Sequence, residues 1–108
     1  MILLPCPYLG KEVEFVDERV AHVTARHPDL LPAHVDLIAK TLQDPDLVRV
    51  SARTTAAKEF SRWYAELLNG KHVIVVVMMS RDSAARPRIV TAYITGRMAR
   101  GNIGWSKN

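Results

Sequence analysis

The sequence predicts an α+β fold in which two N-terminal helices pack on a four-stranded antiparallel sheet. Two helical patterns precede all of the strong strand patterns along the chain. The pair Asn69-Gly70 follows one apolar run and precedes another, and this dipeptide is the strongest short-range signal for a β-hairpin. The chain has 108 residues, 48% of them hydrophobic, which is enough for one hydrophobic core. We therefore expect a single domain over residues 1–108.

The first helix is expected to begin near Asp17, a plausible N-cap residue, after a segment with possible strand character that starts at Glu12. It should end at about His27, because a proline disfavours helical geometry in the residue before it and Pro28 follows. The residues that recur at helical spacing are Val16, Val20, Val23 and His27.

The second helix is expected from about Ala33 to Gln43, and the sequence DPD at 44–46 should end it. A turn, HPDLLP at 27–32, separates the two helices. The predicted buried stripe of the second helix consists of Val35, Ile38, Ala39 and Leu42.

Four strands should follow the helices. The first, at 46–53, alternates apolar and polar residues, which is typical of a half-buried strand. The second, at 58–68, also fits a helix by its pattern, but the Asn69-Gly70 pair favours a hairpin with the third. The third, at 72–79, has no polar alternation, so it should be a central strand covered on both faces. The fourth covers 88–98, and residues 101–108 are expected to form a tail anchored by Trp105.

The last strand contains two alternating sets of residues that must face opposite sides of the sheet. Val90, Ala92 and Ile94 suit the core. Ile89, Thr91, Tyr93 and Thr95 form the other set, and we expect its polar members to lie on an exposed concave face.

Charge is divided unevenly along the chain. Residues 1–46 carry four Lys and Arg against eight acids, a net charge of −4, whereas residues 47–108 carry eleven against three, a net of +8. A surface of one sign attracts and holds phosphates, so the second half favours a polyanionic partner such as RNA. The alternative is a basic surface that is only solvated.

Several classes of protein are disfavoured. No apolar run is long enough to cross a bilayer, and Met1–Leu4 lacks the features of a signal peptide, so we expect a cytoplasmic protein without a membrane partner. A single cysteine, Cys6, allows neither an internal disulfide nor a cysteine metal cage. The four histidines lack metal-ligand spacing, so neither a metal site nor a cofactor is expected.

Candidate catalytic groups lie first on the predicted helix at 17–27. His22 and Arg26 are four residues apart, which places a general base beside a guanidinium that can bind phosphate. The alternative is a solvent-exposed histidine beside an arginine with a structural ion pair. Helical spacing places His27 on the apolar stripe, as a capping or core-edge residue, yet near enough to His22 for both to border one cleft.

Candidates on the predicted strands are polar residues that could bind or act on a phosphodiester. Cleavage without a metal needs a base, an acid and fixed donors for the charge that grows on the phosphate. Each candidate could instead be an ordinary residue of a sheet surface. These residues are Arg62, Tyr64, Thr91 and Tyr93.

The order of these motifs resembles the phage-associated branch of the Barnase, EndoU, colicin E5/D and RelE-like nucleases, the BECR fold. The resemblance covers residues 16–105, with Asp29 standing where the family more often has glutamate. The motifs that carry it are His22, HPD at 27–29, DPDLV at 44–48, RWY at 62–64, VIVVV at 73–77, VTAYITGR at 90–97, and Trp105.

The resemblance implies a metal-independent ribonuclease that cleaves RNA through attack of the 2′-hydroxyl and leaves a cyclic phosphate. It implies His22 and His27 as base and acid, and Thr91 and Tyr93 in the site on the last strand. It is also consistent with a toxin or phage-derived effector, for which an antitoxin or immunity protein is a candidate partner. The residues expected to bind substrate or phosphate are Arg26, Arg62, Tyr64, Arg97 and Trp105.

Two other functions remain open from the sequence. One is a non-catalytic RNA-binding or protein-interaction module on the same scaffold, with structural histidines. The other is a structural subunit whose sheet edge pairs with a partner.

Overall fold

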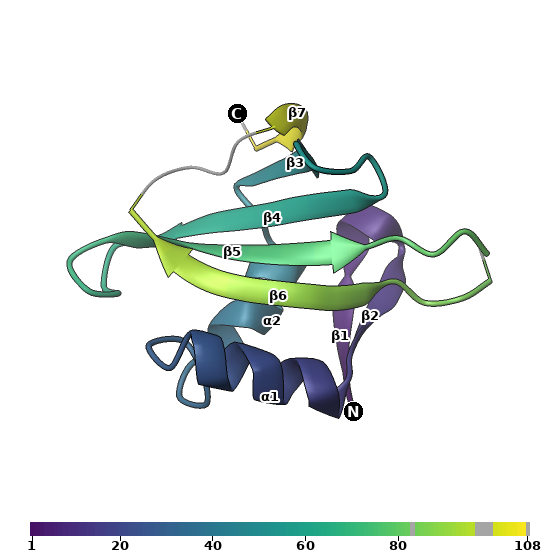
Figure 1. Ribbon diagram of the computed structural model, residues 1–108. Helices are drawn as coiled ribbons and strands as arrows, with labels where there is room; N and C mark the ends of the chain where they lie inside the picture. The colour runs from purple at the N-terminus through teal and green to yellow at the C-terminus, as the bar shows by residue number, and fades with distance from the viewer. Residues whose placement is uncertain (83, 97–100, 108) are drawn as a thin grey trace.

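The computed structural model describes residues 1–82, 84–96 and 101–107. It has an α+β fold with two helices, as predicted (Figure 1). Helix α1 covers Asp17–Arg26 and helix α2 covers Val35–Gln43, both within two residues of the predicted ends. A short 3-10 helix, η1, covers Pro7–Leu9. Neither α-helix in these described ranges is long and apolar enough to span a membrane.

The sheet has seven strands and is mixed, so the prediction of four antiparallel strands is wrong. Its spatial order is β1-β2-β6-β5-β4-β3-β7, and it curls into a half-barrel (Figure 1). The four predicted strands correspond to β3, β4, β5 and β6. The strands are β1 Ile2–Cys6, β2 Lys11–Phe15, β3 Leu47–Ser51, β4 Ala57–Tyr64, β5 Lys71–Met78, β6 Arg88–Thr95 and β7 Gly101–Ser106.

The additional strands form where the local sequence signal is weak. Strand β1 contains Pro5, which has no backbone N–H to donate. An edge strand such as β1 tolerates a proline because one of its two sides has no neighbouring strand to bond. Strand β2 pairs with β1 over its whole length and with β6 in parallel at Glu14↔Arg88. Strand β7 contains glycine, pairs with β3, and replaces the predicted tail. Each of these strands is stabilised by a neighbour rather than by its own composition.

Helix α1 packs against β6 (Figure 1). Strand β2 pairs with β6 only at Glu14↔Arg88, so most of that side of β6 is free for the helix. The Arg19 guanidinium donates from Nη1 to the carbonyl oxygen of Val90 at 3.4 Å. Asp17 is the first residue of the helix rather than its N-cap, a position that Val16 occupies, and its Oδ1 lies 2.7 Å from the amino group of Met1. The first turn of α1 is thereby held to β6 and to the amino group of Met1.

Helix α2 packs on one face of the sheet, the helix face, where most of the core lies. It contacts β1, β4, β5 and η1. The sheet curls around this helix (Figure 1). The predicted stripe is confirmed at Ile38 and Leu42, but Val35 is exposed and Thr41 is buried in its place.

Strand β5 is covered on both faces, as predicted, because residues of both alternations, Val73, Ile74 and Val75, are buried.

A β-bulge in β6 changes the predicted alternation. Val76 pairs with Thr91, but the next residue, Val77, pairs with Ile89, so Val90 is the extra residue. Ile89 is consequently buried in the core, although the alternation had placed it on the exposed face. The predicted core position of Val90 is wrong, because the bulge carries it to the opposite side.

Candidate functional site

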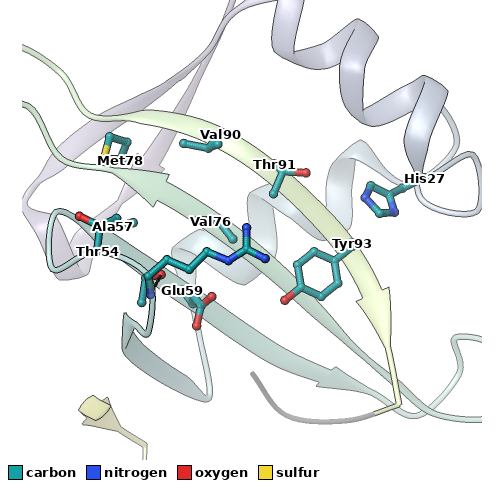
Figure 2. Close-up of a pocket in the computed structure, with 11 residues that line it drawn as sticks. His27, Thr54, Ala57, Glu59, Val76, Met78, Val90, Thr91 and Tyr93 are labelled. Carbon is teal, nitrogen blue, oxygen red and sulfur yellow. Dashed lines mark hydrogen bonds between the residues drawn. The ribbon is translucent and has the colours of Figure 1, made fainter. Parts of the chain in front are cut away.

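A cavity of about 550 Å³ opens on the face of the sheet opposite the core. Strands β3 to β6 and the residue after α1 build it, and we call this side the cavity face (Figure 2). Its polar lining combines an acid, a base and a guanidinium with hydroxyl groups. These residues are His27, Ser51, Arg53, Thr54, Glu59, Thr91 and Tyr93, above an apolar floor of Ala57, Val76, Met78 and Val90.

Strand pairing brings the lining residues together. Glu59 of β4, Val76 of β5 and Thr91 of β6 form one row across the sheet. Alternation then places Tyr93 two residues along β6 on the same side. In Figure 2 the Tyr93 hydroxyl points toward the part of the cavity that contains Glu59.

Glu59 is the one carboxylic acid among the described residues that line the cavity. Its Oε1 is buried, and no hydrogen bond reaches it from the residues that the structure describes. Burial raises the pKa of the Glu59 carboxyl, and the positive charges of Arg49 and Arg53 oppose that rise. Arg49 is also its cross-strand partner on β3. The carboxyl therefore titrates closer to neutral pH than an ordinary glutamate, as a group that exchanges protons during catalysis requires.

His27 and Tyr93 form one wall of the cavity. Their ring centroids are 5.9 Å apart with an interplanar angle of 36°. The backbone N–H of His27 closes α1 by donating to Val23, and its side chain lies at the cavity rather than in the core. Burial and the negative charge of Glu59 raise the pKa of the Tyr93 hydroxyl, while Arg53 opposes the rise. Tyr93 therefore keeps its proton and can donate it in a hydrogen bond.

The two other candidates on α1 lie outside this wall. His22 is half-buried and Arg26 is exposed. Neither is among the described residues that line the cavity. The structure thus separates His22 from His27, which the helical spacing had placed beside one cleft.

Arg62 and Tyr64 lie on the helix face, away from the cavity. Tyr64 is only 3% exposed, and its hydroxyl lies 2.9 Å from the Thr41 hydroxyl. Arg62 donates to the Asp44 carboxylate at 3.0 Å. Lys107 and Arg62 together lower the pKa of Asp44. Both side chains therefore bind other residues of the protein: Tyr64 binds Thr41 and Arg62 binds Asp44.

The last two candidates lie elsewhere in the chain. Trp105 of β7 is 38% exposed, and its ring centroid lies 6.3 Å from that of Tyr8. Both rings line a separate groove beside Pro45. Arg97 lies outside the described residues.

Local sequence patterns do not single out Arg53 and Glu59, which line the cavity, or Arg49, the cross-strand partner of Glu59. The two arginines alternate with apolar residues in the strand at 46–53, which indicated that they share a face. The register that brings Glu59 opposite Arg49 connects segments ten residues apart through a loop. Only the paired strands reveal that these charges meet.

No metal-binding group of three or more His, Cys, Asp or Glu side chains occurs within the described ranges. No protein-family model, curated protein or solved structure matches the chain.

Proposed function

We propose that the protein is an endoribonuclease that cleaves RNA at the cavity without a metal cofactor. The observation that carries the proposal is the meeting of Glu59, whose pKa is raised, with His27, Tyr93 and Arg53 around one cavity. The BECR-type motif order of the sequence and the basic second half of the chain support it.

The reaction assigned to this site is transesterification. The Glu59 carboxylate takes the proton of the 2′-hydroxyl, and that oxygen attacks the adjacent phosphorus. The bond from phosphorus to the 5′-oxygen breaks, and the protonated His27 imidazole gives its proton to the leaving oxygen. The products are a 2′,3′-cyclic phosphate and a 5′-hydroxyl.

Hydrogen-bond donors that line the cavity are assigned to the charge that grows on the phosphate. Arg53 offers a planar guanidinium that binds two phosphate oxygens. The hydroxyls of Tyr93 and Thr91 are further donors, and the raised pKa keeps the tyrosine protonated. The groups assigned to phosphate binding thus come from β6 and from the loop after β3.

The first test is cleavage of total RNA and of a labelled oligoribonucleotide in EDTA. Glu59→Gln should reduce kcat by roughly 10²- to 10⁴-fold, the contribution of general acid-base catalysis. The matched control is Glu66→Gln, because Glu66 is exposed in the turn after β4. Equal activity of Glu59→Gln and the wild type would contradict the assigned base.

A second pair of variants compares the two histidines of the α1 segment. His27→Ala should lose cleavage, whereas His22→Ala should retain most of it, since only His27 lines the cavity. If His22→Ala lost cleavage and His27→Ala retained it, the active site would lie at His22 on α1 and not at the cavity. If RNA stays intact under every condition but binds with steep salt dependence, the protein is a non-catalytic RNA-binding module instead.

A further inference from the structure

An exposed tryptophan lies on the cavity face, outside the cavity itself. Trp63 is 46% exposed and belongs to β4, four residues after Glu59. The register of β4 with β5 runs without a shift from Ala57 to Tyr64, so Glu59 and Trp63 point to the same side. Four residues of strand span about 13 Å.

The indole is held in place from one side. The Trp63 backbone N–H donates to Asp46 Oδ2 at 2.7 Å. The His72 ring lies edge-on to the indole, with centroids 4.9 Å apart. The backbone of Gly70 is also close, because a Cβ at that position would lie 2.5 Å from Trp63 Cζ2. An aromatic ring that is fixed on one side and exposed on the other is suited to stacking.

A partly exposed row of residues leads from the cavity to this ring. Along β6, Thr91, Tyr93 and Thr95 alternate on the cavity face and are all partly exposed. Thr95 pairs with His72, and His72 pairs with Trp63. Ser61 and Ile74 are buried between the two sites, so a ligand would follow β6.

We propose that Trp63 stacks an unpaired base of the RNA bound at the cavity, which makes single-stranded RNA the substrate class. Every nucleobase has an aromatic face, so such stacking tolerates any sequence. Bases within a duplex are already stacked on each other and cannot engage the ring. Burial lowers the pKa of His72, which favours the uncharged imidazole beside the indole. The inference rests on the proposed function for the identity of the ligand.

The test uses an oligonucleotide with 2′-O-methyl groups, which binds but cannot be cleaved. In a Trp105→Phe background, Trp63 is the one remaining tryptophan of the two in the sequence. Its fluorescence should be quenched saturably by the single strand and not by the matching duplex. This measurement leaves residue 63 unchanged, so Trp105→Phe is the one substitution whose folding must be checked, by circular dichroism against the wild type.

Two substitutions then separate stacking from packing. Trp63→Leu should weaken binding roughly 5- to 150-fold, the range found when an aromatic platform is removed, whereas Trp63→Phe should stay near the wild type. The salt dependence of binding should not change, because stacking neutralises no phosphate. A dinucleotide, too short to reach from the cavity to Trp63, should be insensitive to both substitutions.

The outcomes distinguish this inference from the ribonuclease proposal. Equal binding by Trp63→Leu and the wild type, or absence of quenching by a single strand that does bind, would overturn the stacking site even if RNA is cleaved. Quenching and loss of affinity in Trp63→Leu without any cleavage would support the stacking site and contradict the ribonuclease.

Discussion

At the scale of single residues, Glu59 links the chemistry of the cavity to the stability of the fold. Its pKa is raised by burial in the native state, so the native state binds the carboxyl proton more tightly than the unfolded chain does. The stabilising contribution is complete below the ordinary glutamate pKa and is lost as pH rises through the raised native value.

We predict that Glu59→Gln removes this pH dependence. The free energy of unfolding of the wild type should contain a component that decreases between acidic and neutral pH, and the variant should lack it. Chemical denaturation of both proteins at a series of pH values measures the difference. Glu66→Gln, at an exposed position, should keep the wild-type profile. Parallel curves for wild type and Glu59→Gln would show that the carboxyl titrates normally.

At the scale of elements, the β4–β5 hairpin depends on its turn. Leu68, Asn69 and Gly70 all have positive φ, of 47°, 65° and 99°. Asparagine and glycine tolerate such angles, which is why the Asn69-Gly70 pair predicts the hairpin correctly. The turn also positions Trp63, whose ring occupies the space that a side chain at position 70 would need.

Gly70→Ala should therefore destabilise the protein by about 2–4 kcal/mol, from backbone strain together with overpacking against Trp63. The matched control is Gly10→Ala. Gly10 has a φ of 66°, but a Cβ there would meet no atom within 4 Å, so only the strain of about 1–2 kcal/mol applies. Thermal or chemical unfolding of the two variants measures both. Equal losses of stability would mean that the indole moves aside freely.

Helix α1 shows how one element can complete the site of another. It lies beside β6 and is anchored by Arg19 at the Val90 bulge. Pro28 then ends the helix where His27 reaches the cavity wall. Arg19, near the start of α1, contacts the bulge of β6, and His27, directly after the last residue of α1, lines the cavity.

At the scale of the whole molecule, the distribution of charge predicts which arginine would contact the phosphates of the proposed RNA substrate. The cavity contains Arg53, whereas Arg62 on the opposite face is engaged by Asp44 and Asp46. A guanidinium that already pairs with carboxylates releases no counterion from RNA on binding. The net charge of +8 in residues 47–108 therefore overstates the charge that is available to phosphates.

Salt titration of binding to single-stranded RNA tests this distribution. Arg53→Gln should reduce the slope of log K against log salt by about 0.7, the value for one phosphate contact on a single strand. Arg62→Gln should leave the slope unchanged. Circular dichroism of both variants controls for folding. A reduced slope in Arg62→Gln would return that residue to the RNA-binding surface.

The sequence alone determined the features that depend on near neighbours in the chain. Both helices, the end of α1 at Pro28, the buried central strand and the hairpin at Asn69-Gly70 follow from periodicity and turn chemistry. The placement of Thr91 and Tyr93 on the face away from the core also follows, since alternation along one strand decides it. Helical spacing predicts His27 at the core edge, but its side chain lines the cavity.

Only the tertiary structure decided the features that depend on pairing between distant segments. Strands β1, β2 and β7 carry proline, charge or glycine and are stable because a neighbour supplies their hydrogen bonds. Glu59 and Arg53 line one cavity only through the pairing of β3 to β6, and Tyr64 becomes a core residue only because α2 covers it. These contacts join residues that are far apart in the chain, so a pattern within one short segment cannot predict them.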